Sequence, residues 1–257
     1  MKKSNFGVAA LLGLLSVAAM TNSAFAQCPP LGGPSSVMIE FDANCFAYET
    51  NYTAVGFNSS AGSQLTIVGI IDKFYAPLAG LDPTNPAIEY TFVVNATSLG
   101  TVPSVNGPTN IYTTGYTGGT FAIYEGSPEN APLAAAMGSN PPGGATVPAN
   151  FQDGTPILTG ALCGFVTQVT KTGTGLPNGS FTSTYHFTNP NAPGAPPAGN
   201  LFNTVGGADA QFGGLWCVRT GGCTPPGDRA HPNGKWDSPP STPSKSSTWG
   251  MIKQLYR

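Results

Sequence analysis

Short runs of β-branched and aromatic residues recur along the chain and are separated by turns rich in Gly and Pro. Residues 64–75 are almost continuously apolar, which predicts a strand buried on both faces. Residues 88–96 and 180–188 instead alternate between apolar and polar, as half-buried strands do. We expect strands at residues 37–41, 45–57, 64–75, 88–96, 111–113, 120–124, 157–170, 180–188, 201–205 and 212–218.

The connections between these runs carry turn residues, and the longer ones are expected to be loops at residues 98–109, 126–149 and 189–200. Gly118-Gly119 and Asn178-Gly179 predict tight turns, the second of them a hairpin. Amphipathic helical periodicity is missing between the runs, which argues against a βαβ fold and against a helical solenoid. The sequence therefore predicts an all-β fold, an antiparallel β-sandwich of jelly-roll type.

The first 26 residues have the features of a secretory signal peptide. Lys2 and Lys3 give a positive head, residues 8–20 are apolar, and Ala24-Phe25-Ala26 is an A-x-A cleavage site. The apolar run is shorter than the ~20 residues that a transmembrane helix needs. We therefore expect a secreted protein that works in the extracellular space, at the cell surface or in the periplasm, with no transmembrane segment after cleavage.

The composition changes after Cys223, which divides the exported part into three regions. Residues 27–223 form the predicted sandwich domain, and residues 224–247, rich in Pro, Ser and Thr, read as an extended linker. Residues 248–257 form a tail motif whose apolar side chains recur at helical spacing. These are Trp249, Ile252, Leu255 and Tyr256. We expect a short helix that either docks on the sandwich or serves as a recognition element.

Charged residues make up only 9% of the 257-residue chain, well below the ~25% of ordinary soluble domains. The net charge is −2, and Gly (34) and Pro (25) are abundant. Nucleic-acid binding requires clustered Lys and Arg and is therefore not expected. The composition fits short strands joined by many turns.

The chain has five cysteines, an odd number, so export predicts disulfides and at least one remaining thiol. Spacing alone does not fix their connectivity. We predict the bonds Cys28–Cys45 and Cys217–Cys223, each closing a short loop, with Cys163 as a buried thiol. A metal site is not expected, because the spacings lack a C-x-x-C pair.

Two stretches carry a resemblance to secreted bacterial β-sandwich proteins. Residues 119–125 with 151–160 resemble extracellular β-sandwich domains of proteins that have surface-anchoring tails. The end of the chain, Ser-Thr-Trp-Gly-x-x-Lys-x-x-Tyr-Arg, is similar to the C-terminus of some exported proteins of environmental bacteria. The resemblance implies a fold and a location. The tail departs from the usual surface-sorting pattern, since it has no Pro-Glu-Pro motif and no apolar span followed by Arg.

Aromatic side chains on a sandwich face could stack on sugar rings. The binding candidates are Tyr112, Tyr116 and Trp236, whereas Tyr124 and Trp216 lie in strand-like segments and are expected in the core. This pattern would suit a polysaccharide partner, or another component of the cell surface or envelope.

Catalytic signals are few. Glu40 with Asp42, or Glu125 with Asp153, would supply the paired carboxylates of a glycoside hydrolase. His186 is predicted on the polar face of a strand, without the neighbours of a catalytic triad. Calcium-loop spacing is absent and no cofactor is expected. The hypothesis that follows is an exported, non-catalytic structural or adhesion-type module. The alternatives are a carbohydrate-binding module and, after it, a glycoside hydrolase.

Overall fold

The computed structural model describes residues 36–41, 45–53, 57–131, 149–188, 201, 205, 210–218 and 230–238. The predicted signal peptide and the predicted tail helix lie outside these residues. The strands, in chain order, are β1 (Ser36–Phe41), β2 (Cys45–Glu49), β3 (Tyr52–Thr53), β4 (Asn58–Ser59), β5 (Gln64–Ile70), β6 (Lys73–Phe74), β7 (Glu89–Asn106), β8 (Thr109–Gly126), β9 (Thr155–Thr172), β10 (Asn178–Phe187), β11 (Ala210–Val218) and β12 (Ala230–Ser238). A single 3-10 turn, η1 (Ala149–Phe151), precedes β9.

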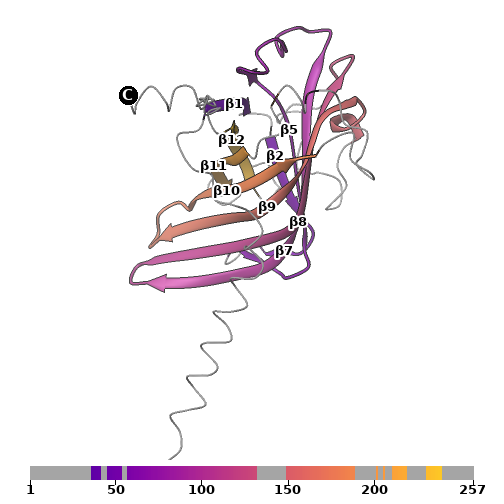
Figure 1. The fold of residues 1–257 in the computed structure, drawn as a ribbon. Coiled ribbons are helices and arrows are strands. Elements are labelled where there is room, and N and C mark those ends of the chain that lie inside the picture. Colours follow the sequence, from indigo (N-terminus) through magenta and orange to yellow (C-terminus); the bar gives the residue numbers. More distant parts are fainter. Residues whose placement is uncertain are drawn as a thin grey trace, which may run out of the picture.

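The predicted all-β antiparallel class is confirmed. Ten of the described strands form one curled antiparallel sheet in the order β11-β10-β9-β8-β7-β5-β2-β12-β1-β6. Strands from β7 to β11 therefore lie beside their neighbours in sequence. In Figure 1 the long strands β7, β8 and β9 sweep around one side of the molecule, and the shorter strands lie inside the curve.

Strand β12 closes the curl, because it pairs with strands from both ends of this order. It pairs with β11 along its whole length, from Gln211↔Asp237 to Val218↔Ala230. It also pairs with β1 from Ser36↔Ser238 to Phe41↔Gly234 and meets β2 at Ala47↔Ala230. The ring β2-β5-β7-β8-β9-β10-β11-β12 leaves few sheet edges open to other chains.

The position of β12 corrects the predicted domain boundary. Residues 224–247 were expected to be a linker because six prolines stand there among Ser, Thr and Gly residues: Pro225, Pro226, Pro232, Pro239, Pro240 and Pro243. Trp236 supplies the apolar anchor that makes this segment a strand, since its side chain is 0% exposed inside the sheet. Gly234 is also required there, because a Cβ at this position would lie 2.4 Å from the Gly213 carbonyl oxygen.

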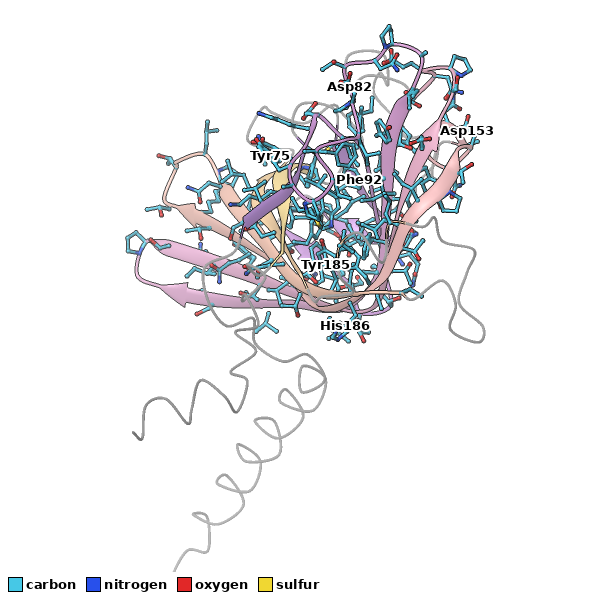
Figure 2. The ribbon with its side chains drawn as sticks, turned by 45° about the horizontal axis from the view of Figure 1, so that its top comes forward. Tyr75, Asp82, Phe92, Asp153, Tyr185 and His186 are labelled. Carbon is cyan, nitrogen blue, oxygen red and sulfur yellow. The ribbon has the colours of Figure 1, made fainter. Side chains whose placement is uncertain are left out.

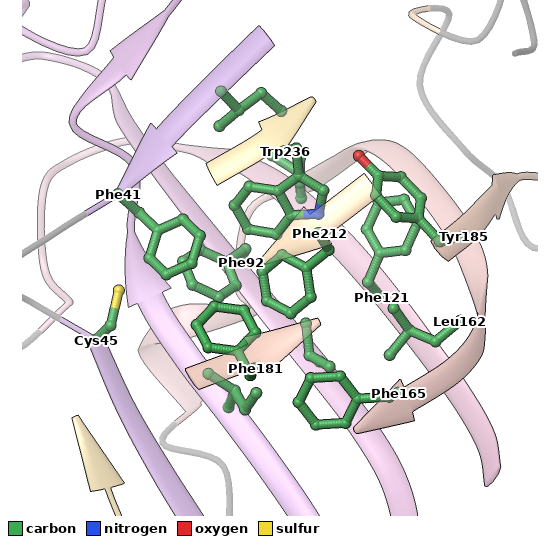
Figure 3. Close-up of a cluster of buried hydrophobic side chains, with 14 of the residues drawn as sticks. Phe41, Cys45, Phe92, Phe121, Leu162, Phe165, Phe181, Tyr185, Phe212 and Trp236 are labelled. Atoms are coloured by element: carbon green, nitrogen blue, oxygen red, sulfur yellow. The ribbon is translucent and has the colours of Figure 1, made fainter. Parts of the chain in front are cut away.

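The interior of the closed sheet is filled by aromatic rings (Figure 3). Trp236 stacks on Phe212 with 4.7 Å between ring centroids and meets Phe92 edge-on at 4.8 Å. Phe41 lies 4.8 Å from both Phe92 and Trp236. Such pairs add about 0.5–1.5 kcal/mol each beyond the burial of their area.

Alternation along the strands directs these rings inward, as the sequence predicted for 88–96 and 180–188. Tyr90 and Phe92 are buried on β7, and Phe181, Tyr185 and Phe187 are buried on β10. Figure 2 shows Tyr185 inside the sheet and the next residue, His186, at the outer surface.

A second, smaller core lies on the outer face of β2, β5 and β7. Phe46, Tyr48, Val68 and Val93 form it, and Phe151 of η1 covers them. The Thr91 hydroxyl donates to the Phe151 carbonyl oxygen at 3.0 Å and fixes η1 there. The expectation that residues 64–75 are buried on both faces is explained by these two cores, with Leu65 and Ile67 in one and Val68 in the other.

A polar network joins the hairpin β3–β4 to the long strands. The Ser59 hydroxyl contacts a Glu49 carboxylate oxygen and lies 2.6 Å from the Ser98 hydroxyl. The Tyr116 hydroxyl donates to the other Glu49 oxygen at 3.3 Å. Because Ser59 and Ser98 are both buried, we interpret this network as a structural anchor for the hairpin.

Two predicted turns and one predicted loop are instead strand. Gly118 adopts φ 63° at a bulge within β8, so the two strands expected around Gly118-Gly119 are one. Asn178-Gly179 opens β10 and pairs with Thr170 and Val169, so the turn between β9 and β10 lies before these two residues, at 173–177. Residues 98–109 were expected to be a loop, but residues 98–106 continue β7, and β8 begins at Thr109. The strand expected at 201–205 is also wrong, since the Val205 N–H donates to the Leu201 carbonyl across one helical turn.

The cysteines differ from the predicted pattern. Cys45 is a buried thiol, so the Cys28–Cys45 bond is wrong. Its sulfur points into the sheet, where a Cβ on Gly69 would lie 2.3 Å from it. Cys163, predicted to be the remaining thiol, is disulfide-bonded, and so is Cys217.

The sheet register shows that Cys163 and Cys217 are not bonded to each other. Thr184 lies opposite both Cys163 and Gln211, and Cys217 is six residues beyond Gln211, about 20 Å along the strand. A disulfide requires Cα atoms within ~7 Å. Their partners therefore lie outside the described residues, and the bond between Cys217 and Cys223 stays a prediction.

We predict that the central ring cluster dominates the free energy of unfolding. Phe212→Ala should lower it by ~3–5 kcal/mol, because a 0% exposed ring leaves a cavity. Leu215→Ala, on the same strand but 65% exposed, should change it by less than ~0.5 kcal/mol. Urea titration followed by tryptophan fluorescence would measure both. Equal losses would contradict the position of the core.

We predict an order of cysteine reactivity that follows from the burial of Cys45 and from the disulfide bonds of Cys163 and Cys217. Cys45 should resist alkylation in the native protein and react once the chain is unfolded in denaturant. Cys163 and Cys217 should react only after reduction as well. Peptide mass spectrometry after stepwise labelling would assign each modification, and labelling of Cys163 in unreduced, unfolded protein would contradict the disulfide pattern.

Candidate functional site

The predicted aromatic binding residues do not form a surface. Tyr116 is 1% exposed and Trp236 is 0% exposed, so both belong to the interior core and neither can stack on a ligand. The prediction for these two residues is wrong because each occupies an inward position in its strand. Tyr112 is half-buried, and its ring packs against Phe57 with 5.2 Å between centroids. The tail motif residues lie outside the described part of the chain.

One predicted pair of carboxylates does come together. Glu125, near the end of β8, and Asp153, after η1, line the same open pocket of about 320 Å³. Gly154 makes this approach possible, since a Cβ there would lie 2.4 Å from the Glu125 carbonyl oxygen. In the other predicted pair, Glu40 accepts a hydrogen bond from the Tyr75 hydroxyl at 2.6 Å, and Asp42 lies outside the described residues.

Both carboxylates of this acidic pocket have neighbours that hold them. The Asn130 side-chain amide donates to Asp153 Oδ2 at 2.8 Å. The Tyr90 hydroxyl is hydrogen-bonded to Glu125, and burial together with this carboxylate raises the pKa of Tyr90 to about 12. Figure 2 shows Asp153 and Asp82 at the same end of the molecule.

Glu89, the first residue of β7, adds a third carboxylate beside this pocket. Its Oε1 accepts the backbone N–H groups of Asn130 at 3.2 Å and Ala131 at 2.9 Å. Burial raises the pKa of Glu89, and the charges of Asp153 and Glu129 add to the rise, while the two backbone hydrogen bonds oppose it. Within the described residues, no three His, Cys, Asp or Glu side chains are grouped so that they could hold a metal ion.

A second depression, of about 410 Å³, lies on the outer face of the sheet across β7, β8 and β9. We call it the Tyr124 groove. Its lining is mostly apolar, with a few uncharged polar groups. The lining residues are Val93, Asn95, Thr120, Phe121, Ala122, Tyr124, Gln152, Pro156, Thr159, Gly160, Ala161 and Thr188.

Strand register explains why the surface is hollow there. Ala122 on β8 lies opposite Thr159 on β9, and Ala161 lies opposite Thr120, so small side chains occupy neighbouring outward positions. Gly160, between Thr159 and Ala161, is instead at an inward position, where a Cβ would lie 2.2 Å from the buried Phe121 ring. A register shift between Ile123 and Tyr124 then brings Pro156 opposite Tyr124, at the end of the groove.

The polar groups of the groove include one that lacks a partner. Thr159 is only 7% exposed, and its hydroxyl makes no hydrogen bond to the described residues. Its backbone carbonyl accepts the Thr188 N–H at 2.8 Å. Asn95 Oδ1 accepts a hydrogen bond from the Thr66 hydroxyl at 3.0 Å. The amide nitrogen of Asn95 therefore points away from Thr66. Gln152 is exposed at the rim.

Sequence reasoning missed this groove. The available signal was a pair of alanines, Ala122 and Ala161, at outward positions beside Tyr124. That signal has meaning only when the register between β8 and β9 is known. His186 on β10 lies opposite Ala161 on β9 and therefore on the same outer face. This agrees with the prediction that His186 lies on the polar face of its strand.

The comparisons with known proteins found no relatives: no family model matches the chain, and no curated protein or solved structure is detectably similar to it. The described residues also contain no helix of the length and apolar character needed to cross a membrane. The site must therefore be interpreted from its own geometry.

We predict that Glu89 makes stability depend on pH. Its pKa is raised in the folded state, so its stabilising contribution is present below the ordinary value of 4.5 and is lost as pH rises through the folded-state value. Glu89→Gln keeps an oxygen acceptor for the two N–H groups but cannot ionise. The variant should therefore gain stability relative to the wild type between pH 4 and pH 7. Thermal unfolding across this range would measure the difference, and parallel pH profiles would contradict it.

Proposed function

We propose that the protein is an exported, non-catalytic module that binds other molecules outside the cytoplasm, in a structural or adhesion-type role. The signal-peptide pattern of residues 1–26 supports export. The observation that carries the proposal of binding is the Tyr124 groove, a concave, mainly apolar site with a few fixed polar groups, as ligand sites usually are.

The lining of the groove favours binding over catalysis. The described residues that line it include no carboxylate, imidazole, amine or thiol. General acid–base and nucleophilic catalysis depend on such groups. The interior of the sheet is occupied by packed rings such as Phe212 and Trp236, so recognition must take place on the outside.

A glycoside hydrolase is the second candidate, and one observation favours it. Glu125 and Asp153 line a single open pocket, as a pair of catalytic carboxylates would. Each of them is engaged by a neutral neighbour, Tyr90 or Asn130. This arrangement also serves to fix the η1 segment onto β8, and we therefore place the hydrolase second.

We predict that the mature protein is retained by extracellular material without altering it. Isolated cell envelopes and extracellular matrix of the producing organism should sediment the protein, and no reducing ends should appear in the supernatant. Glu125→Gln and Asp153→Asn should sediment like the wild type. Release of reducing ends that is abolished by these two substitutions would instead establish the hydrolase. Lack of retention on every fraction would contradict the proposed function.

A further inference from the structure

We infer that the Tyr124 groove binds a neutral saccharide, with the Tyr124 ring as a stacking platform and the uncharged polar groups around it as hydrogen-bonding partners. This inference rests on the proposed function and names the ligand class of the same site. It is carried by three features of the groove, which are a fixed ring, uncharged amides and hydroxyls, and one buried hydroxyl that lacks a partner.

The Tyr124 ring is held in place from one side and open on the other. It packs against the outer core formed by Phe46, Tyr48, Val68, Val93 and Phe151, and it is itself only half-buried. The Tyr124 hydroxyl is protonated at neutral pH, as tyrosine ordinarily is, and can donate; burial raises its pKa further. A tyrosine offers a large rigid surface and a polar end, which suits a ligand with an apolar face and polar edges.

The polar groups have the chemistry that sugar hydroxyls require. Side-chain amides offer donors and acceptors together, and each sugar hydroxyl can both donate and accept. The Asn95 amide nitrogen is left available because its oxygen is held by Thr66, and Gln152 stands at the rim. Thr159 is 7% exposed as a residue, and its hydroxyl oxygen is buried without a hydrogen bond to the described residues, which marks a position where a polar partner is missing.

Other ligand classes fit this lining less well. A hydrocarbon chain would leave the Thr159 hydroxyl and the amides without partners, which is costly in a desolvated site. An anionic ligand would need a cation, but the described lining contains no Lys, Arg or His. The net charge of −2 and the acidic pocket beside Glu125 and Asp153 would also repel anions. A neutral, hydroxyl-rich ring uses every feature of the groove.

The test is a binding measurement on the mature full-length protein with defined sugars. Isothermal titration would compare neutral oligosaccharides of glucose, xylose and N-acetylglucosamine with oligogalacturonate, an anionic sugar. We expect binding to at least one neutral series and none to the anionic one. Tyr124→Ala should weaken that binding at least tenfold because the stacking surface is lost.

Two further variants keep the result interpretable if Tyr124→Ala disturbs the fold. Ala122→Leu adds bulk to the floor of the groove without removing a contact and should also weaken binding at least tenfold. Tyr112→Ala, the same substitution on the same strand but outside the groove, should leave affinity unchanged. Near- and far-ultraviolet circular dichroism would verify the fold of each variant.

The possible outcomes separate this inference from the proposed function. Binding to neutral sugars that is lost in Ala122→Leu and kept in Tyr112→Ala supports the inference. Sugar binding that is unaffected by Ala122→Leu, or lost only in Tyr112→Ala, overturns the assignment of the groove. Retention on envelope material without affinity for any neutral sugar overturns the ligand class and leaves the proposed binding function standing.

Discussion

The pairing of β12 with β11, β1 and β2 is the constraint on which the rest of the structure depends. It joins the two ends of a sheet that would otherwise stay open, and it does so with a segment that has one large apolar side chain. Trp236 stands at the junction and contacts Phe41, Phe92 and Phe212, which belong to β1, β7 and β11. One indole ring therefore connects the first, middle and last parts of the sheet.

Closure of the sheet explains the unusual composition of the chain. A closed sheet removes the exposed edges that charged residues often protect, so a chain with 9% charged residues can still avoid pairing edge to edge. Backbones that approach closely at the junction need glycine, as at Gly214, where a Cβ would lie 2.1 Å from the Asn233 carbonyl oxygen. Partly buried polar groups such as Glu49 are accommodated by hydrogen bonds from Ser59 and Tyr116.

The sequence predicts the strands that carry a strong local pattern and fails where long-range pairing decides. The inward alternation of Phe181, Tyr185 and Phe187 was readable, because β10 is half-buried and regular. The continuation of β7 past Gly100 and Pro103 could not be predicted from the sequence, because Gly and Pro usually end strands. Pro103 is tolerated since β7 pairs with β5 only up to Thr97, and beyond that point the missing N–H removes no hydrogen bond to β5. The Glu125–Asp153 pocket was predicted as a pair, whereas the groove depends on a register that the sequence does not contain.

The same constraint directs where ligand recognition can occur. A closed sheet whose interior is filled by rings has no inner space to offer, so any ligand must be recognised on its outer face or at its ends. The outer face is covered over β2, β5 and β7 by Phe151 of η1 and becomes hollow where Ala122 and Ala161 follow on β8 and β9. Tyr124 lies at the boundary between these two regions, packed on one side and open on the other. The residue that completes the outer core is therefore also the one that we propose as the platform for a ligand.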